Sequence, residues 1–312
     1  AWLGAVLGEL AGAGRDKATF VISPPLSSFG DWVEQLIAES TGKDGTGILP
    51  VVGEPVGEPG VYGRDRLFVY LRLDGDDTYD RDVDALEEAG QPVVRLRLRD
   101  LYDLGEQFFL WEMATAVAGY RLEINPFDQP NVEAAKVLAR QAVAAYRETG
   151  RLPDDEPAPL TSEALTAFLD QAQPGDYVAL QAFVQPVSET SSALQALRTR
   201  IRDTRNLATT VGYGPRFLHS TGQLHKGDRG NGLFIQFTSD PLRDVAIPDQ
   251  VGRPNSSRRP DTPASGMTFG TLIMAQVLGD KQALLEGERR VVRFHLGSDV
   301  AGGLKKLAEM LA

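Results

Sequence analysis

The chain has 312 residues, of which 42% are hydrophobic and 24% are charged, and its formal net charge is −11. This composition is typical of a globular protein with two ordinary domains or one large domain. The negative charge argues against nucleic acid and anionic membrane partners, no apolar run reaches the ~20 residues of a membrane span, and the absence of cysteine excludes disulfides and thiolate metal sites.

The first half of the chain alternates stretches of helical periodicity with short apolar runs. The first residues already have the pattern of a helix interior, which indicates a piece of a longer polypeptide, and no secretory signal is present, which favours a cytoplasmic protein. The predicted helices span residues 2–13, 27–40, 78–89, 105–119 and 130–149, and the predicted strands span 18–23, 48–52, 67–73 and 92–98.

The second half resumes the alternation after a stretch at 151–175 that is rich in Pro, Asp and Glu. The predicted strands here span 177–184, 207–213, 232–238 and 290–296, and the predicted helices span 161–172, 190–203, 268–286 and 301–311. Polar loops are expected at 217–227 and 240–265. Basic clusters lie at 95–99 and 253–259, but neither has the interleaved aromatic residues of a nucleic-acid platform.

This order predicts an α/β fold in which parallel sheets are covered by helices on both faces. We expect a first domain at 1–150, a linker at 151–175 and a second α/β unit at 176–312. The two units are predicted to be divergent repeats, with 90–100 matching 230–240 and 120–124 matching 292–296. Ligands of such folds bind at the carboxyl ends of the strands.

The most specific stretch is Glu123-Ile-Asn-Pro-Phe-Asp-Gln-Pro-Asn-Val-Glu-Ala-Ala-Lys136. Gln129 and Lys136 lie about two helical turns apart, which can direct both side chains to one side near a helix start and so suit an anionic or polyhydroxy ligand. The alternative is an amphipathic helix with a surface lysine. The stretch resembles the C-terminal signature of glucose-6-phosphate isomerases, in which the residues corresponding to Gln129 and Lys136 line the sugar-phosphate site.

A second candidate is Glu54, which follows a predicted strand in Val-Val-Gly-Glu-Pro. A carboxylate at that edge can act as a general base, although an isolated Gly-Glu-Pro is also an ordinary loop. The family carries its catalytic glutamate in Trp-Gly-Glu-Pro-Gly, so the resemblance implies that Glu54 is the base. Val52 replaces the tryptophan here, and a second Gly-Glu-Pro leaves Glu58 as another option.

The remaining candidates also depend on the resemblance. Ser40 and Thr41 lie in Glu-Ser-Thr-Gly-Lys, which is similar to a substrate-binding loop of the family but would also serve as a helix C-cap. The family uses a histidine to open the sugar ring, and no histidine follows Glu54 before Leu67. The repeat points instead to His225 as the catalytic histidine and to His219 as a substrate-binding second candidate. Both could equally be loop histidines without a catalytic role.

The resemblance covers nearly the whole chain and is best to the C-terminal part of bifunctional transaldolase/glucose-6-phosphate isomerases. It implies two sugar-isomerase (SIS) three-layer α/β/α units and conversion of glucose 6-phosphate to fructose 6-phosphate through an enediol, without a cofactor or a metal. The expected partners are the sugar phosphate, the missing N-terminal isomerase and transaldolase segments, and a second copy in a homodimer.

The family's phosphate loop is absent before Glu54, and the stretch 188–192 that superficially resembles it is more typical of an N-cap. The alternative function is therefore a non-catalytic sugar-phosphate-binding or assembly module. An α/β dehydrogenase is disfavoured, because no Gly-x-Gly-x-x-Gly follows the first strand.

Overall fold

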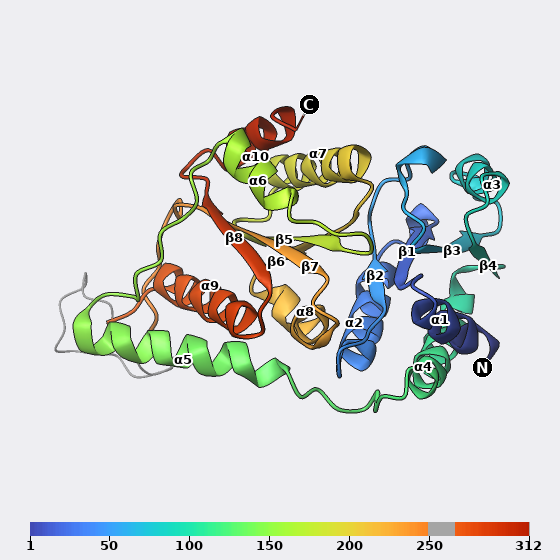
Figure 1. The fold of residues 1–312 in the computed structure, drawn as a ribbon, viewed down its shortest axis with the longest axis horizontal. Coiled ribbons are helices and arrows are strands. Elements are labelled where there is room, and N and C mark those ends of the chain that lie inside the picture. Colours follow the sequence, from blue (N-terminus) through green and yellow to red (C-terminus); the bar gives the residue numbers. More distant parts are fainter. Residues whose placement is uncertain (249–265, 312) are drawn as a thin grey trace.

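The computed structural model describes residues 1–248 and 266–311, and its described part contains two four-stranded parallel sheets (Figure 1). The first sheet has the order β2-β1-β3-β4 and the second β6-β5-β7-β8. This confirms the predicted α/β class with repeated parallel sheets. The strands are β1 (Lys17–Ile22), β2 (Leu49–Val51), β3 (Arg66–Leu73), β4 (Val93–Leu98), β5 (Tyr177–Phe183), β6 (Ala208–Tyr213), β7 (Gly232–Thr238) and β8 (Arg290–His295).

Apart from α8, which was not predicted, the helices follow the predicted order with small shifts at their ends. They are α1 (Trp2–Gly12), α2 (Phe29–Thr41), α3 (Asp80–Glu88), α4 (Leu104–Arg121), α5 (Val132–Thr149), α6 (Ser162–Leu169), α7 (Ser188–Arg205), α8 (Gly222–Gly227), α9 (Phe269–Glu286) and α10 (Val300–Glu309). No helix within the described ranges is long and apolar enough to cross a membrane. The predicted basic loop at 253–259 lies outside the described residues.

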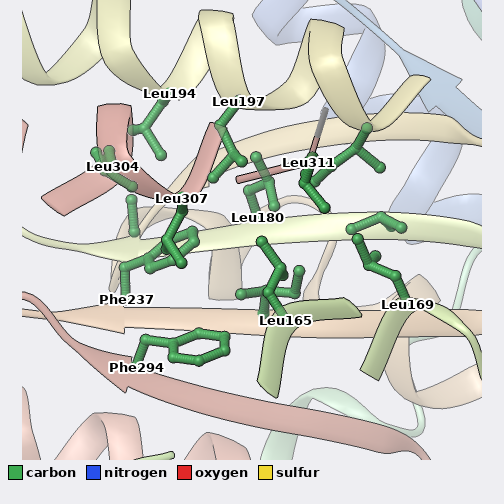
Figure 2. Packing of buried hydrophobic residues seen from close by; sticks show 14 of the residues in the cluster. Leu165, Leu169, Leu180, Leu194, Leu197, Phe237, Phe294, Leu304, Leu307 and Leu311 are labelled. Atoms are coloured by element: carbon green, nitrogen blue, oxygen red, sulfur yellow. The ribbon is translucent and has the colours of Figure 1, made fainter. Parts of the chain in front are cut away.

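Strand residues alternate between two hydrophobic cores in each unit, which is the expected consequence of the pleat. In β3, Leu67 and Val69 pack with α1, α2 and α4, whereas Phe68 and Tyr70 pack with α3 on the other face. The second sheet does the same, and Figure 2 shows its largest core between the strands and α6, α7 and α10. Helices on both faces therefore give three layers in each unit.

The other face of the second sheet packs on the first unit. This shared core joins Leu49 and Val51 of β2 to Tyr177 and Ala179 of β5. Apolar packing therefore holds the two units together, in addition to the polar contacts described below. Side chains of each unit contact residues of the other.

The two units are repeats, but the predicted correspondence between their strands was wrong by one strand. Strand order makes β3 the counterpart of β7 and β4 the counterpart of β8, whereas the prediction matched β4 with β7. The predicted extended run at 120–124 is also wrong, because α4 continues to Arg121 and Glu123 then takes a positive φ of 59°. Within the described residues the first sheet ends at β4, and residues 120–124 add no strand to it.

Two other regions have a structure or contacts that differ from the prediction. The predicted polar loop at 217–227 forms a 3₁₀ turn and α8, because Phe217 and Leu224 are buried. Helix α5 lies in the predicted first domain but packs along α9 of the second unit (Figure 1). Gly279 permits this approach, since a Cβ there would lie 2.5 Å from the backbone nitrogen of Ala139. The stretch after α5 is anchored too, through the ion pair of Asp155 with Arg293.

Candidate functional site

The two motifs that carried the resemblance meet in the structure through Lys43. This side chain is 1% exposed, donates hydrogen bonds to the backbone carbonyls of Asn125 and Asp128, and forms an ion pair of 3.0 Å with the Asp128 carboxylate. Burial of an ammonium group requires such partners. Lys43 therefore fixes the loop that carries Gln129 against the end of α2. Lys43 is the last residue of the Glu-Ser-Thr-Gly-Lys motif and was not among the predicted site residues.

Helix α8 of the second unit completes this junction through Gln223. Its amide group donates to the carbonyl of Gly42 and to the side chain of Asn131, each at 2.8 Å, and its oxygen accepts the backbone N–H of Asn131 at 2.9 Å. Gln223 is fully buried. The end of α2, the start of α5 and α8 are consequently held in one fixed arrangement, and nothing in the local sequence around Gln223 indicated this role.

Around this junction lie Glu39, Gln129, Lys136 and His219, which we call the Glu39 cluster. The Gln129 amide donates to the Glu39 carboxylate at 3.2 Å, and Gln35 donates to the same oxygen at 3.3 Å. Burial raises the pKa of Glu39, and the positive fields of His219 and Lys136 partly oppose this rise. Three of the four residues were predicted as site residues, but Glu39 was not.

Lys136 and His219 also line a groove of about 730 Å³ between α5, α8 and α9. The basic residues in its wall are Lys136, Arg140, Arg147, His219 and Lys226, and its one acidic residue is Glu148. Its floor is largely apolar. Lys136 forms an ion pair with Glu133 at 3.1 Å, and Lys226 forms one with Asp280 at 2.7 Å. In a chain of net charge −11, this basic wall is a local exception that suits an anion.

Glu54 lies in a different environment, which we call the Glu54 cluster, formed with Arg66, Arg198 and Thr209. The residue is 6% exposed, and its carboxylate lies 3.1 Å from the guanidinium of Arg66 and accepts the Thr209 hydroxyl at 2.8 Å. Although burial opposes ionisation, the charges of Arg66 and Arg198 and these hydrogen bonds together hold its pKa below the usual range.

The Glu54 cluster joins the two units. Arg198 on α7 donates to the carbonyl of Val52 at 3.1 Å, and Arg202 donates to the carbonyl of Pro55. Glu54 does not line the groove that contains Lys136. Its assignment as general base stays a prediction, and its contacts are those of a structural ion pair. Glu58, the alternative carboxylate, is exposed.

The other predicted residues lie apart from the groove or have local roles. His225 is 2% exposed, accepts a hydrogen bond at Nδ1 from the Gln181 amide at 3.3 Å, and packs on Phe217 and Phe234. Burial holds its pKa well below the usual range, so it is neutral. Thr41 is buried, donates to the carbonyl of Ile37 and accepts the N–H of Ile48, whereas Ser40 is half-buried.

The stretch 188–192 lies inside the first turns of α7 and does not provide its N-cap, which is Val187. Glu189 and Thr190 line a second cleft of about 1010 Å³ at the carboxyl ends of the second sheet. Ser191 shares a hydrogen bond of 2.8 Å with Tyr213. Within residues 1–248 and 266–311, no group of three or more His, Asp or Glu side chains is arranged to bind a metal ion.

Part of the chain is similar in sequence to glucose-6-phosphate isomerases. The enzymes of Pediococcus pentosaceus, Streptococcus pyogenes and Enterococcus faecalis are 31%, 32% and 28% identical to it over 151 aligned positions. In each case the match covers 36% of this chain and 34% of the relative. The chain thus spans about a third of the length of the curated relatives that it matches. No family model matches the sequence.

The matches to solved structures are weak and distant in sequence. A hypothetical protein from Thermus thermophilus is 15% identical with a TM-score of 0.36, and the match covers 99% of this chain and 81% of that one. The C-terminal domain of glucosamine-fructose-6-phosphate aminotransferase from Francisella tularensis is 10% identical with a TM-score of 0.29, covering 98% and 86%. The established relationship is therefore homology between about a third of this chain and glucose-6-phosphate isomerases.

Proposed function

We propose that this chain forms part of an aldose–ketose isomerase that interconverts glucose 6-phosphate and fructose 6-phosphate at the Glu39 cluster. The observation that carries the proposal is the convergence of Glu39, Gln129, Lys136 and His219. They come from three segments that are far apart in the sequence, and two of them, Lys136 and His219, line a basic groove. Sequence homology to glucose-6-phosphate isomerases supports the same class of substrate.

The reaction requires a base that removes the proton from C2 of the open-chain sugar and returns it to C1 of the enediol. We assign this role to Glu39, because its raised pKa makes it a stronger base than an ordinary glutamate and it is not paired with a buried cation. As a carboxylate it accepts the C2 proton, and as a carboxylic acid it delivers that proton to C1, so the enzyme returns unchanged.

The neighbouring groups supply the remaining functions. Lys136 and His219 lie where positive charge stabilises the oxygen that becomes negative in the enediolate. The Gln129 amide orients the Glu39 carboxylate through its hydrogen bond of 3.2 Å. The phosphate of the substrate would lie against the basic wall of the groove, to which Arg140 contributes.

The Glu54 cluster is the reason for preferring Glu39 over the base that the motif predicted. A general base must reach the substrate, whereas Glu54 is enclosed by Arg66 and Thr209. A depressed pKa also makes Glu54 the weaker base of the two. In this proposal Glu54 contributes to catalysis only by holding the two units together.

The test compares Glu39→Gln and Glu54→Gln in a coupled assay that converts fructose 6-phosphate to glucose 6-phosphate. We expect Glu39→Gln to lower kcat by at least about 100-fold with an unchanged melting temperature, since removal of a general base typically costs that much. Glu54→Gln should lower the melting temperature more than it lowers kcat of the folded fraction. The reverse ranking of the two kcat values would contradict the assignment.

A non-catalytic role predicts a different result. The chain spans about a third of its relatives, so the site is proposed to be completed by the N-terminal isomerase segment that the resemblance implies. If this chain binds fructose 6-phosphate in a calorimeter but shows no turnover with or without that segment, a sugar-phosphate-binding module is the correct description. Binding that is lost in Lys136→Gln, but kept in a Lys305→Gln control on α10, would place the ligand at the groove.

A further inference from the structure

The groove between α5, α8 and α9 follows almost the whole length of α5. Its lining includes Val132 in the first turn of this helix and Arg147 in the last turn. These two residues are about 22 Å apart along the helix axis. A hexose phosphate held by Lys136 is shorter than that and would occupy only one end. The rest of the groove is open to a longer ligand.

The two ends of the groove have different walls. Helix α8 forms the wall at the start of α5, where Gln223 donates to the side chain of Asn131 at 2.8 Å. Arg289, which follows the end of α9, donates to the carbonyl of Lys226 in α8 at 2.9 Å. Helix α9 therefore runs antiparallel to α5, as Figure 1 shows, and Leu272 near its start forms the wall beside the last turns of α5.

An apolar floor and a basic edge follow α5 side by side. Ala135, Ala139 and Val143 lie four residues apart, which puts them on one side of the helix, and all three line the groove. The basic lining residues of the same helix form a neighbouring row, which consists of Lys136, Arg140 and Arg147. A ligand that matches this surface has an apolar body and a negative charge.

The dimensions of the groove select a single chain of atoms. A volume of about 730 Å³ over about 22 Å gives a mean cross-section of about 33 Å², whereas a helix of about 10 Å diameter requires about 80 Å². An extended peptide fits poorly for another reason. The walls are helices whose backbone groups are already paired within each helix, so they cannot satisfy the backbone of a strand. An alkyl chain has no polar groups that require a partner.

The charges place the negative group at the α8 end. Lys136, His219 and Lys226 line that end, whereas Glu148, the acidic residue among the described lining residues, lies at the other. Lys226 is held by its ion pair with the buried Asp280. The pair of Lys136 with Glu133 is exposed, and such surface pairs contribute little stability, so Lys136 can exchange this partner for a ligand carboxylate.

We propose that the groove binds a free fatty acid, with its carboxylate at Lys136 and His219 and its alkyl chain along Val143 towards Leu272. Binding itself does not depend on the proposed isomerase activity. Because the head group takes the place of a sugar phosphate at Lys136, the fatty acid also excludes that substrate, and this regulatory consequence rests on the proposed function.

Titration calorimetry with octanoate and decanoate tests the ligand class. Affinity should rise by about fourfold for each CH₂ added, as expected for burial of an alkyl chain. Decyltrimethylammonium, which has the same chain as a decyl carboxylate but the opposite charge, should bind at least about 10-fold more weakly than decanoate. Affinity that is independent of chain length, or equal for the two charges, would overturn the proposal.

Substitutions on α5 test the position of the chain. Val143→Glu puts a carboxylate in the path of the alkyl chain and should weaken decanoate binding by at least about 10-fold. Ala144→Trp fills the same space from an exposed position, so it separates this effect from a loss of folding. The matched control is Val137→Glu, on the same helix, 41% exposed and outside the lining. Decanoate binding that survives both groove substitutions would contradict the assignment.

Competition separates this inference from the proposed function. Saturating fructose 6-phosphate should raise the apparent dissociation constant of decanoate, and Lys136→Gln should weaken both ligands. Simultaneous binding of the two ligands would refute the shared position at Lys136. If fructose 6-phosphate does not bind at all, while decanoate still follows the chain-length and groove-variant results, the isomerase proposal fails and the fatty-acid site stands.

Discussion

Two carboxylates of the first unit face the second unit, and their surroundings are opposite. Glu54 meets the guanidinium of Arg66 at 3.1 Å and the hydroxyl of Thr209 at 2.8 Å, and its pKa falls. Glu39 meets only the amides of Gln35 and Gln129 as hydrogen-bond donors, and its pKa rises. Glu54 is ion-paired with Arg66 of its own unit and hydrogen-bonded to Thr209 of the second unit, whereas Glu39 is a carboxylate that can exchange a proton.

The difference shows that the local motif does not decide what a glutamate does. Glu54 follows a strand in the sequence context that the isomerase resemblance marks as catalytic, yet α7 and β6 of the second unit enclose it. Glu39 ends a helix in an unremarkable position, and the Gln129 loop places an amide beside it. The groups that the rest of the fold puts opposite each carboxylate set its pKa and its accessibility.

The largest expected effect follows from removing the cation of the Glu54 cluster. Arg66→Met leaves Glu54 as a buried charge without its nearest partner, and we expect the free energy of unfolding to fall by about 3–5 kcal/mol. Chemical denaturation of the variant measures this loss. Arg64→Met, at an exposed position two residues earlier, is the control and should change stability by less than about 0.5 kcal/mol. Equal effects of the two would mean that the Glu54 cluster is not a stabilising ion pair.

A third carboxylate sharpens the comparison. Glu34 lies on the same helix as Glu39, is buried against the second unit, and accepts only the Ser220 hydroxyl at 3.3 Å. Burial raises its pKa from 4.5 to about 7. Between those two pH values the folded chain binds more protons than the unfolded chain, so stability falls as the pH rises, by about 3 kcal/mol for this one group.

Glu34→Gln should abolish that part of the pH dependence. Denaturation midpoints of the variant and the wild type, measured from pH 4.5 to 8, should diverge as the pH rises, with the variant more stable at the alkaline end. Glu112→Gln, at an exposed position of α4, should follow the wild-type curve. A wild-type curve that rises through this window and is unchanged by Glu34→Gln would show that Ser220 and the nearby arginines keep Glu34 charged.

A substitution in α9, which packs on α5, should disrupt the Glu39 cluster indirectly. Gly279→Ala forces a methyl group towards the backbone of α5 at Ala135 and Ala139, between which Lys136 lies. We expect a loss of about 1–3 kcal/mol in stability, as for overpacked interiors, together with weaker binding of fructose 6-phosphate. Gly12→Ala, where an added Cβ contacts nothing within 4 Å, should affect neither quantity. Unaltered ligand binding in Gly279→Ala would mean that the position of α5 does not matter to the site.

The smallest effect distinguishes the two histidines. His219 borders the groove with Lys136, whereas His225 is buried and neutral. His219→Gln should lower kcat/KM by about 10-fold with little change in melting temperature. His225→Gln should do the opposite, lowering the melting temperature and sparing kcat/KM of the folded enzyme. If His225→Gln is instead the kinetic variant, the histidine assignment made from the repeat would hold.

The sequence alone predicted most of the fold, because strands and helices of this chain differ clearly in apolar period. The alternation of buried runs with amphipathic stretches identified all eight strands of the described residues, and it predicted parallel sheets. It failed at 120–124, which was predicted as an extended run but contains the end of α4 at Arg121 and a turn at Glu123. Such a run becomes a strand only if a neighbouring strand is available to pair with it, and that is not a local property.

The site residues also divide into those that the sequence predicted and those that it did not. Gln129 and Lys136 were found because a run of fourteen residues fixes their spacing on a loop and a helix, and the resemblance to isomerases is specific in that run. Lys43, Gln223 and Glu39 could not be assigned, since their roles depend on contacts across 85, 181 and 90 residues of chain. The sequence determined which side chains stand near one another along an element. Only the tertiary structure decided which carboxylate is paired with a cation and which is free to carry a proton, because Arg66 of the same unit and Thr209 of the second unit enclose Glu54 whereas Glu39 meets two amides.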